Sequence, residues 1–175
     1  AQNFNHTSWR HSPQFFVPKV CKYVANLHRW LQNYKIISTG GTLIQGQCVY
    51  GNANFSWLPK LEVGLLSGYR DILHAEDVMK AAIIMMSQEK SGLYEVASGE
   101  LQNMYKVLEY AFGAVKMDYE KFIVQKDDLF RPPSSETCPP VCLCYKLRSL
   151  GWEPSFGTKE LIGSMVIEYL ARGIK

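Results

Sequence analysis

The sequence predicts an α/β fold built around one hydrophobic core. Its 175 residues are 47% apolar and 20% charged, which is an ordinary globular composition and enough chain for one compact domain. Stretches with apolar residues three and four apart, typical of helices, alternate along the chain with short apolar stretches typical of strands. Because such alternation is characteristic of α/β proteins, we expect residues 1–175 to form a single domain of this class.

The first third of the chain predicts a strand end, a helix and an insertion. Residues 3–7 are expected to end a strand. Ser12-Pro13 suits the start of a helix, since Ser can cap it and Pro fits the first turn, and apolar residues at helical spacing run over 14–32. Residues 35–60 are rich in Gly, Ser, Asn and Gln with interspersed aromatics, so we expect an inserted long loop or small hairpin there.

The middle of the chain predicts two further strand-and-helix pairs. Leu61, Val63 and Leu65 alternate as in a strand, and a helix is expected over 74–88. A short strand over 93–97 is followed by the turn residues Ser98-Gly99. Apolar residues then recur at three to four over 101–112, which predicts the next helix.

The last third predicts one strand and two helices. Residues 121–125 are typical of a strand, and residues 131–140 hold four of the eight prolines, so they are expected to be extended or looped. A short helix is expected over 145–150, ending at Gly151. Thr158 is expected to cap the final helix.

Charge and hydropathy exclude some classes of function. The formal net charge of +3, from 19 Lys and Arg against 16 Asp and Glu, is too small to favour nucleic-acid binding, and we expect none. No apolar run approaches the ~20 residues of a membrane-spanning helix. The N-terminus has no signal-peptide pattern and no initiating methionine, which favours a processed product or part of a longer chain.

The five cysteines are odd in number and irregularly spaced, which favours free thiols over a disulfide framework. We therefore expect an intracellular, reducing location, either cytoplasmic or organellar. A zinc site at Cys138, Cys142 and Cys144 is the alternative, but no fourth ligand stands at a familiar spacing.

Two motifs of nicotinamide-dependent enzymes are missing. No glycine-rich G-x-G-x-x-G or G-x-x-G-x-x-G segment follows a predicted strand, and the only adjacent glycine pair is Gly40-Gly41. No Tyr-x-x-x-Lys stands in a predicted helix, because the match beginning at Tyr105 has Glu109 at the lysine position.

Five phrases in order resemble the extended short-chain dehydrogenase/reductases that act on GDP-mannose: FNHTSWRHSPQFFVPKV, VGLLSGYRDILHAEDVMKA, YEVASGE, DLFRPPSSE and KLRSLGWEP. The GDP-mannose 4,6-dehydratases are the best match, and the GDP-6-deoxy-mannose reductases are close. The resemblance covers nearly the whole chain except residues 35–60. It implies the C-terminal, substrate-binding part of an NAD(P)-binding Rossmann-like fold, without the N-terminal dinucleotide-binding half.

The resemblance implies roles for residues near the N-terminus. Asn5 is expected to face the substrate and His6 the nicotinamide end of NADP, although the two could instead hold a strand-to-loop turn. Lys19 is expected near the guanosine diphosphate, with an ordinary solvated lysine as the alternative.

Two arginines and one acid complete the implied substrate site. Arg70 and Arg131 are expected near the diphosphate, where two planar guanidinium groups would neutralise charge at short range. The alternative for Arg70 is an ion pair with a neighbouring acid such as Asp71. Glu136 is expected to hold ribose hydroxyls or to be a surface acid.

His74 and Asp77, one helical turn apart, could look like a ligand pair. Asp77 in the first turn of the expected helix also suits the positive end of the helix dipole. We therefore prefer a structural role for both residues.

The chain also departs from the family pattern. His11 stands where the family has an arginine that reaches the NADP phosphate, and a neutral imidazole cannot make the bidentate contact of a guanidinium. Trp9 replaces a common proline and Leu65 a frequent asparagine. NADP, which the family implies, is therefore not expected to bind to this chain alone.

The catalytic residues that the resemblance implies, a Tyr-Lys pair, a Thr or Ser and a Glu base, would all precede residue 1. We therefore expect no catalytic residue here and no dehydratase activity from the chain alone. The first hypothesis is a nucleotide-sugar-binding portion that works with a complementary Rossmann half. The second is a structural or accessory subunit of a larger assembly, possibly organellar, and the third is a stand-alone nucleotide-binding module.

Overall fold

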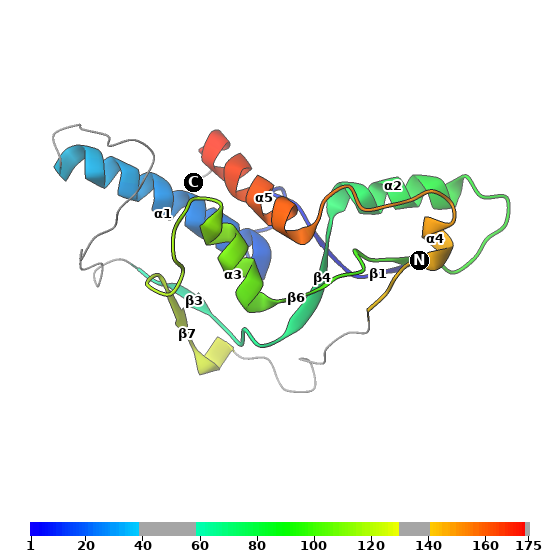
Figure 1. Cartoon of the computed structure of the whole chain (residues 1–175), viewed down its shortest axis with the longest axis horizontal. Coiled ribbons are helices and arrows are strands. Elements are labelled where there is room, and N and C mark those ends of the chain that lie inside the picture. The colour runs from blue at the N-terminus through cyan, green and yellow to red at the C-terminus, as the bar shows by residue number, and fades with distance from the viewer. Residues whose placement is uncertain (39–58, 130–140, 174–175) are drawn as a thin grey trace.

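The computed structural model describes residues 1–38, 59–129 and 141–173. Helices and strands alternate along most of this chain (Figure 1). The elements in order are β1 (Gln2–Asn3), β2 (Asn5–Thr7), α1 (Phe16–Ser38), β3 (Leu61–Val63), β4 (Tyr69–His74), α2 (Ala75–Met86), β5 (Glu95–Val96), β6 (Leu101–Asn103), α3 (Met104–Gly113), β7 (Ile123–Gln125), the 3-10 helix η1 (Asp127–Leu129), α4 (Tyr145–Arg148) and α5 (Thr158–Arg172).

The described strands form three small sheets, in which parallel pairs dominate. β1 pairs in parallel with β5, β3 with β7, and β2 with β4, while β6 adds to β4 in the antiparallel sense. Parallel pairs whose strands are separated by helices are the hallmark of α/β proteins, so the predicted fold class is confirmed.

One core lies where α1, α3 and α5 pack together, at the end of the molecule opposite α2 and α4 (Figure 1). Helical spacing puts one apolar face of α1 inward, including the fully buried Val20 and Val24. Phe112 of α3 stacks on Phe122, with ring centroids 6.1 Å apart. Met165 of α5 completes the centre of this cluster.

A second core joins α2 and α4 to β5. Ala81, Val96 and Leu147 are buried in it together with Trp152, which is 2% exposed. The indole nitrogen of Trp152 donates a hydrogen bond of 3.0 Å to the carbonyl oxygen of Asp77. The buried apolar residues therefore form two cores, which lie at opposite ends of the molecule (Figure 1).

Several predicted boundaries were wrong. The strand β4 was not expected, and β6 occupies residues 101–103, where a helix was expected; α3 begins only at Met104, with Asn103 as its cap. Thr158 is the first residue of α5 and not its cap, because Gly157 holds that position. The first helix runs on to Ser38, beyond the expected end at residue 32.

Most of the predicted insertion lies outside the described residues. Residues 35–38 belong to α1 and residues 39–58 are not described. The single domain with an insertion at 35–60 therefore stays a prediction.

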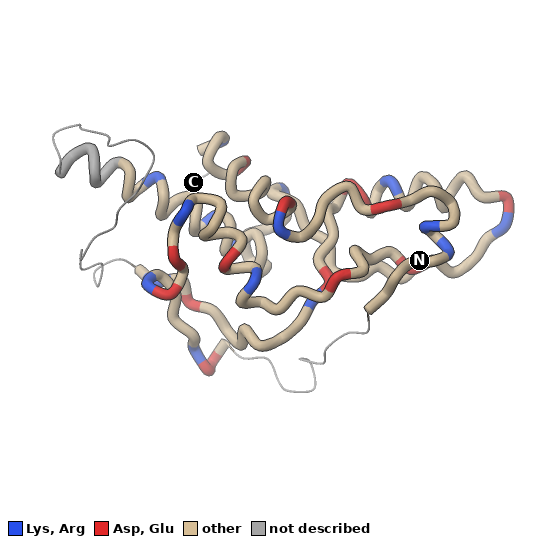
Figure 2. The backbone as a smooth tube through the Cα atoms, viewed as in Figure 1, with Lys and Arg blue, Asp and Glu red and all other residues tan. Residues whose placement is uncertain are grey.

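The described cysteines, Cys21, Cys142 and Cys144, are buried free thiols. Within the described ranges, no group of three or more His, Cys, Asp or Glu side chains could hold a metal ion. Cys48 and Cys138 lie outside those ranges, so the zinc alternative is not tested as a whole. No helix in the described part of the chain is long and apolar enough to cross a membrane. Basic and acidic residues are interspersed along the described chain (Figure 2).

Candidate functional site

A cavity of about 330 Å³ opens between β2, β3, β4 and the first turn of α1. Its volume lies at the lower end of the ~300–1,000 Å³ typical of small-molecule sites. The lining mixes apolar with polar and charged side chains: Asn5, Thr7, His11, Gln14, Phe15, Phe16, Val17, Pro18, Lys19, Glu62, Val63, Gly64, Leu65, Arg70, Ile72, Met104 and Leu129.

Strand pairing brings predicted residues that are far apart in the sequence to this cavity. The parallel register of β2 and β4 sets Asn5 opposite Ile72, two residues beyond Arg70 on the same strand. The first turn of α1 contributes Lys19, whose backbone N–H bonds to Phe15 at 2.9 Å. Asn5, Lys19 and Arg70 therefore line one cavity, while their roles in ligand binding stay predictions.

Two cationic side chains at the cavity, Lys19 and Arg70, each donate a hydrogen bond to a backbone oxygen. Lys19 Nζ donates to the carbonyl oxygen of Glu62 at 2.8 Å, and the Glu62 carboxylate pairs with Lys126 Nζ at 2.5 Å. Arg70 Nη1 donates to the carbonyl oxygen of Tyr69 at 2.7 Å. Two cationic side chains and the carboxylate-bearing Glu62 therefore lie together at the cavity.

The neighbouring Asp71 has a structural role. Its two carboxylate oxygens accept hydrogen bonds from the backbone N–H groups of Ser98, at 2.8 Å, and Gly99, at 2.9 Å. Asp71 is 1% exposed, so these bonds satisfy a buried carboxylate. Asp71 therefore fixes the turn after β5.

The described residues do not by themselves fit a dinucleotide cofactor. His11 stacks on Phe15, with ring centroids 4.1 Å apart, where the family pattern has a phosphate-binding arginine. His6 is exposed on β2 and is not among the residues lining the cavity. No described strand leads through a glycine-rich turn into a helix. NADP binding by this chain therefore remains an expectation from the family. The described part of the chain shows no site that matches it.

Two predicted site residues, Arg131 and Glu136, lie outside the described residues. Glu62 and Phe15 are among the several lining residues that were not predicted as part of a site. Because side chains alternate along a strand, the sequence could have placed Glu62 on the opposite face of β3 from Leu61 and Val63. No sequence signal pointed to Phe15, which is 54% exposed.

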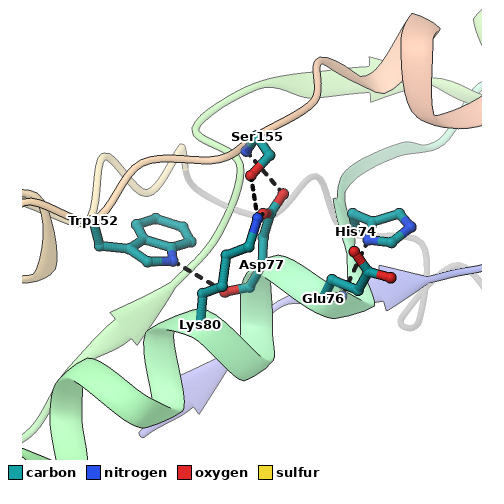
Figure 3. A network of polar contacts seen from close by, with 6 residues as sticks. All are labelled: His74, Glu76, Asp77, Lys80, Trp152 and Ser155. Carbon is teal, nitrogen blue, oxygen red and sulfur yellow. Dashed lines mark hydrogen bonds and ion pairs between the residues drawn. The ribbon is translucent and has the colours of Figure 1, made fainter.

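His74 and Asp77 form a structural network and not a ligand pair (Figure 3). His74 Nδ1 accepts the backbone N–H of Glu76 at 3.1 Å, which caps α2. Asp77 is fully buried and accepts the backbone N–H of Ser155 at 3.0 Å and Lys80 Nζ at 3.2 Å. The network ties α2 to the segment before α5, which confirms the structural interpretation.

Comparison with known proteins shows which family the chain matches. Residues 50–165 match the model of a family described as GDP-mannose 4,6 dehydratase. GDP-mannose 4,6 dehydratase 2 from Arabidopsis thaliana is 31% identical over 111 residues, which are 63% of this chain and 30% of that protein. GDP-mannose 4,6 dehydratase 1 from the same plant has the same identity and coverage.

Solved structures share the fold at lower identity. RMD from Pseudomonas aeruginosa, in complex with NADPH, has a TM-score of 0.71 at 20% identity over 97% of this chain and 47% of its own. UDP-glucose 4-epimerase from Thermotoga maritima, with UDP-glucose, has a TM-score of 0.67 at 15% identity over 99% of this chain and 45% of its own. The chain thus spans under a third of the curated relatives and under half of these solved chains.

Proposed function

This chain belongs to the GDP-mannose 4,6-dehydratase family, and on that premise we propose that it is the portion of such a protein that binds a nucleotide sugar. The observation that carries the proposal is the cavity where Asn5, Lys19 and Arg70 meet. Its two cations suit a diphosphate, and its apolar walls suit the less polar parts of a nucleotide sugar. GDP-mannose is the ligand that the family favours, with Arg131 and Glu136 as further proposed contacts.

We propose that the chain needs a complementary dinucleotide-binding half to catalyse dehydration. NADP would be held by that half, and His6 would face it. The stacking of His11 on Phe15, at the position where the resemblance implies a phosphate-binding arginine, supports this division. A reducing compartment suits the chain, since its described cysteines are free thiols.

Calorimetric titration of GDP-mannose into the full chain tests the role of Arg70. Arg70→Ala should weaken binding about tenfold to a hundredfold, because it removes a charge-assisted contact to phosphate. The affinity of Arg70→Lys for GDP-mannose should fall between those of the wild type and Arg70→Ala, because Lys keeps the charge but lacks the planar guanidinium group.

The matched control is Lys159→Ala, which removes a positive charge from the exposed face of α5, away from the cavity lining. It should bind GDP-mannose as the wild type does. Equal binding by Arg70→Ala and the wild type would overturn the proposed role of Arg70.

A structural or accessory subunit is the second candidate. The exposed apolar side chains of α2, with Met86 83% exposed, favour this function, because such a surface is costly in water. The departures at Trp9, His11 and Leu65 also suit a chain that has lost its ligand. An accessory subunit would assemble with partners without binding GDP-mannose, so the same titration separates the two candidates.

A further inference from the structure

Two cysteine thiols lie side by side just before α4. The sulfur atoms of Cys142 and Cys144 are 3.6 Å apart. The two residues are 7% and 2% exposed, and both belong to the second core. Neither residue lines the proposed nucleotide-sugar cavity, so this thiol pair is a separate feature of the molecule.

The backbone brings the two sulfur atoms together. Cys144 has a φ of +51°, in the left-handed region that residues with a Cβ rarely adopt. The guanidinium group of Arg148 donates hydrogen bonds to the carbonyl oxygens of Leu143, at 2.9 Å, and Ser98, at 3.3 Å, which ties the segment between the cysteines to the turn after β5. Because residues held in such a sparsely populated conformation cluster at ligand-binding and catalytic sites, the thiol pair is a candidate site.

The surroundings of Cys144 suit a sulfur atom that carries negative charge. Its Sγ accepts a hydrogen bond of 3.1 Å from the backbone N–H of Ala97. Burial raises the pKa of the Cys144 thiol to about 12, and the positive charge of Arg148 acts in the opposite direction. The thiolate is the form that oxidants attack, so the raised pKa protects this thiol from oxidation. A metal ion, in contrast, takes the place of the thiol proton.

We propose that Cys142 and Cys144 together bind one soft, thiophilic metal ion of the Cu(I) class. Thiolate ligands select such ions over hard cations such as Mg²⁺ and Ca²⁺. Two thiolates suffice for Cu(I), whereas a structural zinc site takes four ligands. Within residues 1–38, 59–129 and 141–173, no third His, Cys, Asp or Glu side chain joins the thiol pair, so the ligands described there suit a two-coordinate ion.

The two sulfur atoms need to move little to hold an ion between them. With metal–sulfur bonds of about 2.3 Å, as in zinc thiolates, a linear ion would set the sulfurs ~4.6 Å apart, roughly 1 Å more than their present distance. On binding, two S–H bonds are replaced by two S–Cu bonds, and two protons leave to water without any transfer of electrons. The site then has one net negative charge, which the N–H of Ala97 and the guanidinium group of Arg148 offset.

Titration of the reduced full chain with Cu(I), supplied without oxygen as its bicinchoninate complex, tests the site. We expect the chain to remove one Cu(I) from the chelator. The thermal midpoint of the chain should rise, because an ion that binds only the folded state stabilises that state. The X-ray absorption spectrum of the loaded chain should show two sulfur neighbours around the copper.

Two double variants locate the ion. Cys142→Ser/Cys144→Ser should weaken Cu(I) binding by at least about a hundredfold, because even the outer partners of metal ligands contribute ~10–100-fold in affinity. Cys48→Ala/Cys138→Ala keeps the thiol pair and should bind Cu(I) as the wild type does. The thermal midpoint of each variant without copper shows whether it is folded.

Four outcomes would overturn the inference: no copper taken from the chelator, three or more sulfur neighbours, unchanged affinity in Cys142→Ser/Cys144→Ser, or lost binding in Cys48→Ala/Cys138→Ala. If the serine variant does not fold, the alanine variant still decides. It retains only the thiol pair and Cys21, which is buried in the first core. Two sulfur neighbours in the alanine variant would therefore support the site, and any other number would contradict it.

Discussion

At the scale of single residues, the buried polar groups do most to join distant segments. Asp71 and Asp77 are the buried carboxylates of the described chain, and each accepts a backbone N–H from a segment at least 27 residues away. The sequence could show that these residues are acidic and near expected elements. It could not show their partners, since those depend on the tertiary fold.

Replacing Asp71 tests this assignment. Asp71→Asn should lower the free energy of unfolding by about 1–3 kcal/mol, because an amide nitrogen would face a backbone donor where a carboxylate oxygen now accepts. Urea denaturation followed by tryptophan fluorescence measures the loss. Glu95→Gln, at an exposed position of β5, is the control and should change little; a similar loss in both variants would contradict the account.

A substitution at Thr158 should raise the free energy of unfolding rather than lower it. Its Oγ1 is buried with no hydrogen-bond partner in the described structure, and the residue is 2% exposed. Thr158→Val should therefore raise the free energy of unfolding by about 1 kcal/mol, since it removes a desolvated hydroxyl of similar shape. Thr158→Ser keeps the hydroxyl, loses the methyl group and should destabilise. If the valine variant is less stable than the wild type, Oγ1 has a partner after all.

Cys144 predicts a pH dependence. Burial, and secondly the hydrogen bond with Cys142, raise the pKa of the Cys144 thiol to about 12. The folded state therefore keeps the Cys144 thiol protonated above the ordinary thiol pKa of about 8.5. The stability that this bound proton contributes is lost as pH rises from about 8.5 toward 12. Unfolding free energies measured between pH 8 and 11 should fall with pH, and less steeply in Cys144→Ala. Equal slopes would contradict the buried, protonated thiol.

At the scale of elements, helices were easier to predict than strands. The apolar periodicity of α1, α2 and α5 was long enough to reveal them. β4 was missed because the buried Asp71 interrupts its apolar pattern and because α2 follows it without a turn. β6 was merged into α3 because Leu101 stands at helical spacing from Met104, although Asn103 was a cap signal that could have separated them.

The turn between β5 and β6 can be tested through its glycine. Gly99 has a φ of +88°, a region that residues with a Cβ rarely adopt. Gly99→Ala should lower the free energy of unfolding by about 1 kcal/mol or more. Gly113→Ala is the matched control, since Gly113 ends α3 with nothing within 4 Å of an added Cβ, and it should be neutral or slightly stabilising. Equal thermal midpoints for the two variants would contradict the strained turn.

At the scale of the whole molecule, the order of the sequence motifs predicted the family, whereas local apolar spacing did not predict which distant residues lie together. The phrases around His6, Arg70 and Trp152 led to the family, which the comparisons confirm. Three of the six predicted site residues, Asn5, Lys19 and Arg70, line one cavity. That grouping could not be read from the sequence, because it depends on the register between β2 and β4 and on how α1 packs.

The most direct test of nucleotide-sugar binding is a calorimetric titration of GDP-mannose into the full chain, alone and co-purified with the dinucleotide-binding half. We predict saturable binding at one site per chain in at least one of these forms, weaker for UDP-glucose and reduced by Arg70→Ala. Absence of binding in both forms would contradict the account.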